Sequence, residues 1–195
     1  PFPHQSHKRD VIVVVAESYG EILFRDPHFE GFEEDMQAFD ASIKDAGFHV
    51  RSRYVYAPVF GGSSWMADAS FLCGVKIPNQ LLYESLWDTS ANLCMPQLFE
   101  EAGYRTVLAA ANTTFADSRF KELFPFDRLL MKNDFEYEGP RYAWSFIPDQ
   151  YVLHYLLEQE IKAPEEPLFA TILLASSHHP WQAIPSYIDD WSVLG

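Results

Sequence analysis

The sequence predicts a three-layer α/β/α sandwich with a mainly parallel central sheet. Two strands of the buried type, at residues 11–16 and 167–175, lie near opposite ends of the chain, and helical patterns alternate with strand patterns between them. Such alternation is typical of a parallel sheet that carries helices on both faces. No internal repeat or low-complexity tract interrupts it.

The first strand carries five consecutive β-branched residues, Val11 to Val15. A half-exposed strand would alternate apolar and polar side chains, so this run predicts a strand covered on both faces. The strand leads directly into Glu17-Ser18. Because ligands of open α/β sheets bind at the carboxyl ends of the strands, Glu17 is a candidate functional residue.

Periodicity and helix-ending residues predict the other elements. Residues 33–46 carry apolar side chains at helical spacing and are followed by Gly47, a typical helix terminator. We expect further strands at residues 48–57 and 104–111, and further helices at residues 64–73, 96–102, 115–123 and 149–161.

Length and charge limit the class of function. A chain of 195 residues with 48% hydrophobic content can bury one substantial core. The length allows one domain or a small pair, and we expect a single domain over residues 1–195. The net charge of -14 argues against the phosphate-backbone attraction that drives nucleic-acid binding. An anionic substrate would therefore need a metal ion or local cations.

No apolar run approaches the roughly 18–20 residues of a membrane span. The chain begins with Pro1 rather than Met. We therefore expect an excised domain whose upstream targeting or membrane segment has been removed.

The chain contains two cysteines, Cys73 and Cys94. Two are too few for a disulfide framework, and they lack the paired spacing of a zinc site. The simplest interpretation is a pair of buried free thiols. A single bridge between them is the alternative if the domain is exported.

A glycine-led serine turn, Gly61-Gly-Ser63-Ser64, precedes the helix expected at residues 64–73. Glycines let the backbone approach a ligand closely, and a helix that begins at Ser64 would direct free N–H groups at an anion. A serine hydroxyl is a weak nucleophile that needs a base or a metal ion. Taken alone, the turn is more typical of a plain helix cap, but with Glu17 it predicts half of a metal-activated nucleophile site.

A serine esterase is an alternative explanation of the turn. Its nucleophile elbow requires Gly-x-Ser-x-Gly, and Met66 stands where the last glycine would be. The sequence therefore argues against an esterase.

The order of these segments resembles the alkaline phosphatase and sulfatase superfamily, most closely its lipoteichoic acid synthase and phosphoglycerol transferase branch. In that branch the first strand ends in Glu-Ser, as Glu17-Ser18 does, and the glutamate binds the catalytic divalent metal. The family nucleophile lies ten residues before a glycine, and counting back from Gly74 gives Ser64, with Ser63 as the reserve candidate. The resemblance implies an alkaline phosphatase-like fold in which Glu17 and Ser64 bind Mn, Mg or Zn and Ser64 is catalytic.

Other segments extend the resemblance. Residues 94–107 match the family's helix-then-strand unit, which marks the fold. The turn Ser176-Ser-His178-His179-Pro180-Trp181 is similar to a family turn whose first histidine contacts the substrate phosphate, which implies a catalytic and substrate-binding role for His178.

Three more residues are candidate substrate contacts by the same resemblance. Trp144 resembles a tryptophan that lines the headgroup pocket, although a core aromatic is an equal alternative. Asn112 and Arg119 follow the strand expected at residues 104–111, where the branch carries polar and basic substrate contacts. An arginine on a helix is, however, also typical of a solvated face.

The sequence departs from the family in two places. The family completes its metal site with a downstream Asp-His pair, and no Asp-His dipeptide occurs in this chain. The acidic position that the transferases carry within Ser-Glu-Phe is here Ala67-Asp68-Ala69. We expect a catalytic domain truncated at its C-terminus, and the alternative is an inactive binding domain.

The resemblance implies metal-dependent transfer or hydrolysis of a phosphoryl-linked headgroup, such as phosphoglycerol or phosphoethanolamine, through a covalent phospho-Ser64. It also implies an anionic phospholipid headgroup or phosphate ester as partner, no nucleic acid, and a membrane-anchored full-length protein in an extracytoplasmic location. A sulfuric-ester or phosphodiester hydrolase is the alternative. Sulfatase activation needs a Cys-x-Pro-x-Arg type motif, and residues 64–68 contain neither the proline nor the arginine.

Overall fold

The computed structural model describes residues 8–88, 94–114, 118–143, 146–162, 166–180, 183–190 and 193. The chain folds into two compact units. The first, termed the sheet unit, comprises Pro1–Glu17 and Pro58–Gly195. The second, termed the helical unit, comprises Ser18–Ala57.

A four-stranded parallel sheet with the order β1-β4-β2-β3 forms the centre of the sheet unit. Its strands are β1 (Val11–Val15), β2 (Arg105–Ala110), β3 (Arg128–Met131) and β4 (Leu168–Leu173). In register, Val11 lies opposite Phe169, and Thr106 lies opposite Phe169 on the other side of β4. All four strands therefore end at the same edge of the sheet, as the sequence predicts for a parallel sandwich.

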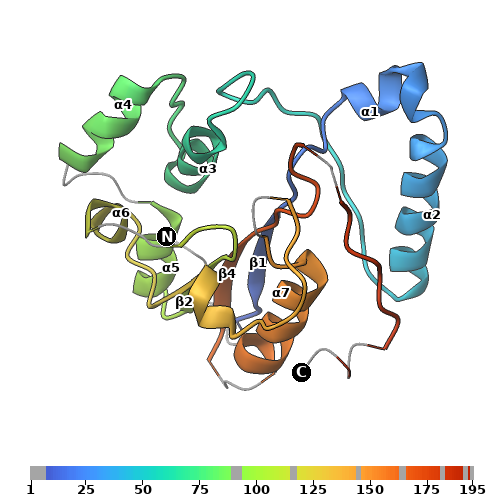
Figure 1. Ribbon diagram of the computed structural model, residues 1–195. Helices are drawn as coiled ribbons and strands as arrows, with labels where there is room; N and C mark the ends of the chain where they lie inside the picture. The colour runs from blue at the N-terminus through green and yellow to red at the C-terminus, as the bar shows by residue number, and fades with distance from the viewer. Residues whose placement is uncertain are drawn as a thin grey trace. The chain divides into compact units, whose positions relative to one another are not determined.

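Helices pack on both faces of this sheet (Figure 1). One face carries α3 (Ser64–Cys73), α4 (Gln80–Ser85), η2 (Leu86–Asp88), α5 (Met95–Glu101) and α6 (Ser118–Leu123). The other carries η3 (Lys132–Phe135), α7 (Asp149–Leu156) and the π-helical turn η4 (Leu157–Ile161). The predicted three-layer sandwich is confirmed.

Alternation along β2 divides the core into two layers. Leu108 and Ala110 face the α3 side, whereas Val107 and Ala109 face the α7 side. On the α3 side, Phe99 stacks on Phe169 at a ring separation of 4.0 Å. Each large side chain fully buried in these layers contributes about 1.5–3 kcal/mol to the free energy of unfolding.

A buried ion cluster joins the sheet to η4 at the edge opposite the strand ends. Glu160 is 2% exposed and pairs with both Arg105 and Arg128, which begin β2 and β3. Two guanidinium groups offset the cost of burying one carboxylate.

Only one face of β1 is covered. Val11 and Val13 pack against the core on the α3 side, but Ile12 and Val14 are 42% and 48% exposed. The prediction that both faces of this strand are buried is therefore wrong. In the described sheet, β1 is an edge strand paired only with β4, so its β-branched run fits one covered face.

The helical unit contains α1 (Ile22–Arg25), η1 (Pro27–Phe29) and α2 (Phe32–Asp45). The helix predicted at residues 33–46 is confirmed. Three carboxylates in its first turn, Glu33, Glu34 and Asp35, suit the positive end of the helix dipole.

The strand predicted at residues 48–57 is wrong. This segment is extended but belongs to no described sheet, and Val55 is 88% exposed. Strand-forming residues such as Val and Tyr become a strand only beside a partner strand, which the described part of the chain does not provide here.

The other predicted elements match α3, α5, α7 with η4, β2 and β4 to within a few residues. The helix predicted at residues 115–123 corresponds to α6 from Ser118 onward, and residues 115–117 lie outside the described residues. The short elements β3, α1 and α4 were not predicted.

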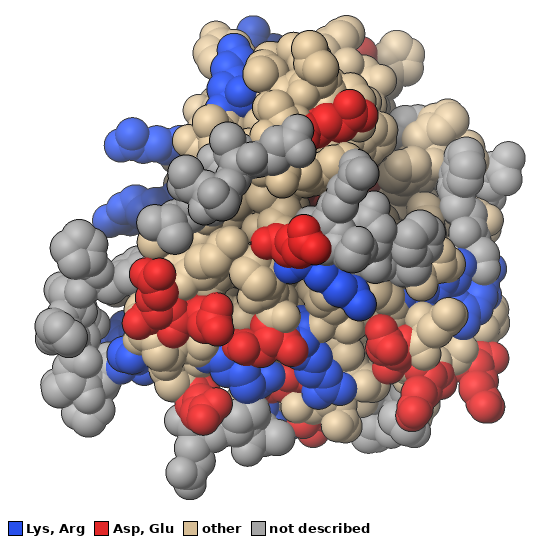
Figure 2. Space-filling view, turned by 90° about the vertical axis from the view of Figure 1, so that its left-hand side faces the viewer, with Lys and Arg blue, Asp and Glu red and all other residues tan. Residues whose placement is uncertain are grey.

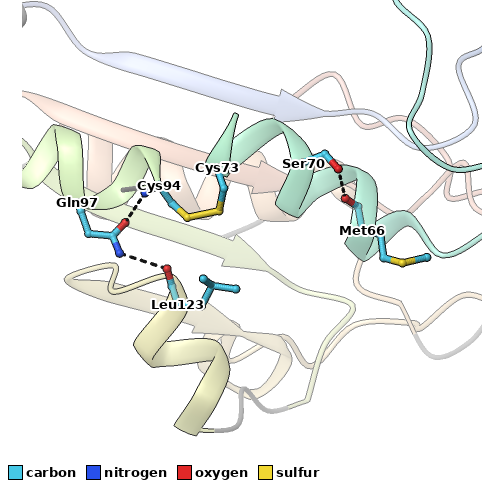
Figure 3. Close-up of a disulfide and its surroundings, with 6 residues drawn as sticks. All are labelled: Met66, Ser70, Cys73, Cys94, Gln97 and Leu123. Carbon is cyan, nitrogen blue, oxygen red and sulfur yellow. Dashed lines mark hydrogen bonds between the residues drawn. A yellow bond between two sulfur atoms is a disulfide. The ribbon is translucent and has the colours of Figure 1, made fainter. Parts of the chain in front are cut away.

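A disulfide joins Cys73 at the end of α3 to Cys94 at the start of α5 (Figure 3). The prediction of two free thiols is wrong, and the alternative of a single bridge is correct. Gln97 adds polar links, since its amide oxygen accepts from Cys94 N at 3.1 Å and its amide nitrogen donates to Leu123 O at 3.3 Å. The bridge thus fixes the far end of the helix that begins at Ser64.

The surface carries no concentrated basic patch on the face seen in Figure 2, where acidic and basic side chains are interspersed. Among the described residues, no helix combines the length and the apolar character needed to cross a membrane.

Candidate functional site

A cavity of about 380 Å³ lies between the sheet and α3, at the carboxyl ends of β2, β3 and β4. It is lined by polar groups and by a larger set of aromatic and aliphatic side chains. The polar residues are Ser64, Asp68, Asn112 and Thr113, and the aromatic residues are Trp65, Tyr83, Trp87, Phe120 and Phe124. This is the edge at which open α/β sheets bind ligands.

Ser64 is the first residue of α3, lines the cavity and is exposed to solvent. The turn before it needs left-handed backbone conformations, with φ of 72° at Gly61, 121° at Gly62 and 61° at Ser63. Ser63 occupies the N-cap position, but its side chain makes no capping hydrogen bond. The side chain of Ser63 therefore does not cap α3.

Asp68 lies one helical turn beyond Ser64 and lines the same cavity. A spacing of four residues places both side chains on one face of α3. Burial, and secondarily the negative charge of Glu17, raise the pKa of Asp68 from 3.8 to about 6. The Glu17 and Asp68 carboxylates are thus close enough to repel one another.

Glu17 follows β1 and is half-buried. Its backbone carbonyl accepts a hydrogen bond from Ser177 Oγ at 2.6 Å, and Leu174 N donates to Val15 O at 3.0 Å. These bonds join the end of β1 to the turn that follows β4. The residue after Glu17, Ser18, has a φ of 65°.

His178 lies in that turn, one residue beyond Ser177, and is half-buried. Its backbone N–H donates to Ala175 O at 3.0 Å, and its ring packs edge-to-face on Phe146 at 5.6 Å. The structure therefore places His178 beside the segment that contacts the Glu17 backbone.

Asp149, at the start of α7, also holds this turn through hydrogen bonds. Its carboxylate accepts from Ala175 N at 2.8 Å and Ser176 N at 2.9 Å, and Asp149 N donates to Ser176 Oγ at 2.9 Å. Burial raises the pKa of Asp149, and these hydrogen bonds partly oppose the rise. From the sequence, Asp149 is predicted only to begin a helix. The Pro148-Asp149 dipeptide is the one local feature of the sequence that marks this position.

The aromatic wall of the cavity is held by its own contacts. Trp65 Nε1 donates to Gln80 Oε1 at 3.3 Å, and Gln80 Nε2 donates to Glu84 Oε1 at 3.0 Å. Tyr83 and Trp87 pack edge-to-face at 5.3 Å. This wall could not be predicted from the sequence, because its members come from α3, α4, η2 and residues 120–124.

The structure brings only some of the predicted site residues together. Ser64 and Asn112 line the cavity, whereas neither Glu17 nor His178 does. The helix α6 includes Arg119, but its side chain lies outside the described residues, as does all of Trp144. The roles predicted for these residues stay predictions.

Two of the predicted site residues carry oxygen donors. The Glu17 carboxylate and the Ser64 hydroxyl are the donor types that Mg²⁺ and Mn²⁺ accept. The charge repulsion between Glu17 and Asp68 is the kind that a cation relieves. Within the described ranges, no group of three or more His, Cys, Asp or Glu side chains could hold a metal ion.

The sulfatase family model matches residues 69–192 of this chain. The chain belongs to the sulfatase family. The superfamily generally comprises enzymes that transfer or hydrolyse sulfate or phosphate esters and generally use divalent metals. The matched region begins after Ser64, so the family match covers neither Ser64 nor Glu17.

Two solved structures share the fold. One is a protein of the alkaline phosphatase superfamily from Vibrio parahaemolyticus, with 17% identity and a TM-score of 0.64 over 96% of this chain and 46% of that chain. The other is the lipoteichoic acid synthase LtaP from Listeria monocytogenes, with 20% identity and a TM-score of 0.65 over 93% of this chain and 44% of that chain.

The chain thus spans less than half the length of either structure. No match to it is found among curated proteins. The resemblance to the alkaline phosphatase superfamily, drawn from the sequence, is confirmed, and so is the alkaline phosphatase-like fold.

Proposed function

We propose that this chain carries the nucleophile half of a metal-dependent site that transfers, or hydrolyses, a phosphoryl-linked headgroup such as phosphoglycerol or phosphoethanolamine. The observation that carries the proposal is the position of Ser64. It begins α3, is exposed, and lines the cavity at the carboxyl ends of the strands. We also propose that residues 1–195 are the N-terminal part of one catalytic domain.

In the proposed reaction, Ser64 Oγ attacks the phosphorus of the donor and forms a covalent phospho-Ser64, while the rest of the donor leaves as an alcohol. Free backbone N–H groups in the first turn of α3 stabilise the negative charge on the phosphoryl oxygens. An acceptor alcohol or water then attacks phospho-Ser64, and the serine hydroxyl is restored.

Glu17 and Ser64 are the residues that would hold the metal. A divalent ion held there would supply Lewis-acid chemistry, lowering the pKa of the serine hydroxyl and polarising a phosphoryl oxygen. His178 would stabilise the phosphate or donate a proton to the leaving alcohol. Asn112, Arg119 and Trp144 would contact the substrate.

We propose that the full-length protein acts on an anionic phospholipid headgroup or a phosphate ester, outside the cytoplasm and anchored to a membrane. The Cys73–Cys94 disulfide supports this location, because disulfides persist in oxidising compartments. No nucleic-acid partner is proposed.

A second candidate is a binding domain that retains the sheet and the serine turn but performs no turnover. The lack of an Asp-His dipeptide in the chain favours it. Hydrolysis of a sulfuric ester or a phosphodiester by the same site is a third.

The test is turnover of a nitrophenyl phosphodiester by the full-length protein with Mn²⁺. We expect Ser64→Ala and Glu17→Gln each to lower kcat by about 10³-fold or more, because each removes a group acting on the reacting phosphorus. Glu101→Gln, an exposed carboxylate on α5, is the matched control and should leave kcat unchanged. Turnover that survives both site substitutions would overturn the proposal.

A further inference from the structure

We infer that Asp149 is a positioning residue for the proposed reaction. Its carboxylate holds the turn at residues 175–178, termed the histidine turn, and thereby keeps His178 in place beyond the end of β4. This inference rests on the proposed function, which gives His178 a role at the phosphate. It assigns a role to a half-buried carboxylate that takes no direct part in the proposed reaction.

The side chain of Asp149 reaches from the start of α7 to the histidine turn. One carboxylate oxygen accepts from Ala175 N at 2.8 Å, and the other accepts from Ser176 N at 2.9 Å. In return, Asp149 N donates to Ser176 Oγ at 2.9 Å. Hydrogen bonds to a carboxylate are stronger than those between neutral groups. Three bonds to two successive residues therefore fix the backbone of the turn on its α7 side.

His178 depends on the residues that Asp149 holds. Its backbone N–H donates to the carbonyl oxygen of Ala175 at 3.0 Å, and the N–H of the same Ala175 is bound by Asp149. Its ring packs edge-to-face on Phe146 at 5.6 Å, and Phe146 lies three residues before Asp149. Residues 146–149 thus support both the backbone and the ring of His178.

The orientation of the His178 ring is set within the same turn. Nδ1 forms a hydrogen bond with the carbonyl oxygen of His179. Because a carbonyl oxygen only accepts, Nδ1 carries the proton in this bond. A proton exchanged with a ligand would then be held at Nε2. The direction of Nε2 therefore depends on the backbone that Asp149 holds.

The histidine turn is also tied to β1, and these bonds do not involve Asp149. Leu174 N donates to Val15 O at 3.0 Å, and Ser177 Oγ donates to Glu17 O at 2.6 Å. Loss of the Asp149 bonds would release the α7 side of the turn and leave it attached to the sheet. A displacement of about 1 Å at a reacting group can lower the rate by about 10²-fold, so such a release is enough to impair His178.

The first experiment measures turnover of a nitrophenyl phosphodiester by the full-length protein with Mn²⁺. Asp149→Asn keeps the size of the side chain but replaces one acceptor oxygen by an NH₂ group, so one of the two carboxylate bonds is lost. We expect kcat, expressed per Ser64 that can be phosphorylated, to fall by about 10- to 100-fold while KM changes by less than about threefold.

A double-mutant cycle separates positioning of His178 from a general loss of stability. In a His178→Ala background, Asp149→Asn should lower kcat by less than about twofold, because the side chain that it positions is already absent. Ser176→Ala removes only the bond to Asp149 N and is the milder variant of the same contact. It should show the same loss of effect in the His178→Ala background.

Asp127→Asn is the matched control. Asp127 accepts from Thr106 N at 2.7 Å and from Thr106 Oγ1 at 2.9 Å, near the start of β2 and at the edge of the sheet opposite the cavity. It loses the same kind of bond as Asp149→Asn. We expect it to lower the free energy of unfolding measured in urea and to leave kcat unchanged.

The outcomes distinguish this inference from the proposed function. Wild-type kcat in Asp149→Asn and Ser176→Ala, or equal loss of kcat with and without His178, would overturn the inference. Loss of turnover in Ser64→Ala together with unchanged kcat in His178→Ala would overturn the inference alone. Turnover that survives Ser64→Ala would overturn the proposed function, and the inference with it.

Discussion

At the scale of single residues, strained backbone lies next in sequence to both Glu17 and Ser64. Ser18 and Ser63 adopt left-handed conformations, with φ of 65° and 61°, directly after Glu17 and directly before Ser64. Such a conformation costs about 1–2 kcal/mol for a non-glycine residue. Strained backbone of this kind concentrates at functional sites, where the surrounding structure holds it in place.

The pKa of Asp68 gives a prediction for stability. Because it rises from 3.8 in the unfolded chain to about 6 in the folded chain, the folded chain binds this proton more tightly. The stabilisation that comes from protonating Asp68 in the folded chain is complete below about pH 3.8. It declines as the pH rises toward 6 and is absent above about pH 6. Asp68→Asn, which cannot ionise, should therefore raise the free energy of unfolding at pH 7.5 by about 1–3 kcal/mol.

Urea unfolding of the wild type and Asp68→Asn at pH 4 and pH 7.5 measures this difference. The increase in the free energy of unfolding caused by Asp68→Asn should be much smaller at pH 4 than at pH 7.5. The control Glu101→Gln should show no increase at either pH. Equal stability of wild type and Asp68→Asn at pH 7.5 would contradict the assigned environment of Asp68.

Sequence motifs predict roles for Glu17 and Ser64 because both lie at recognisable points, the end of a buried-type strand and the start of a helix, and these roles stay predictions. The chemistry of Asp68 could not be predicted in the same way. Its environment depends on how α3 approaches the end of β1, and that is a tertiary contact. The same holds for Asp149, whose partners lie 26 and 27 residues away in the chain.

At the scale of elements, prediction succeeded where one element buries a continuous or periodic apolar surface. β2, β4 and α3 are of this kind. It failed at residues 48–57, where strand propensity lacks a partner strand, and at β3, which has only four residues. Cysteine pairing was also undetermined, because it depends on the end of α3 lying beside the start of α5.

The Cys73–Cys94 bridge gives a prediction at this scale. It closes a loop with a sequence separation of 21, and restricting the unfolded chain to that extent stabilises the fold by about 3 kcal/mol. Replacing both cysteines by Ala should lower the free energy of unfolding by about that amount, as measured by urea denaturation. A loss below about 1 kcal/mol would show that the bridge does little to hold α3 and α5 together.

At the scale of the whole molecule, the two units differ in how much of their surface is buried. β2 buries five of its six residues, whereas α2 in the helical unit contains no buried residue. Composition predicted one substantial core, and the structure places the described buried residues in the sheet unit. The length of the chain allows one domain or a small pair, and the apolar spacing of α2 gives no sign in the sequence that this helix lacks buried residues.

Hydrogen exchange should reflect this difference. Elements with little buried apolar surface open at low free-energy cost, so amides of α2 should exchange at least about 10²-fold faster than those of β2 and β4. Mass spectrometry or NMR on the native protein measures both sets at once. Equal protection of α2 and β2 would contradict the burial described for the helical unit.

We propose that Ser64, and not its neighbour Ser63, is the covalent nucleophile. The most direct test incubates the full-length protein with Mn²⁺ and a nitrophenyl phosphodiester, stops the reaction in acid and maps the phosphorylated serine by tandem mass spectrometry. We predict the phosphoryl group on Ser64, its persistence in Ser63→Ala and its loss in Ser64→Ala. A phosphoryl group on Ser63, or none on either serine, would show that Ser64 is not the covalent nucleophile.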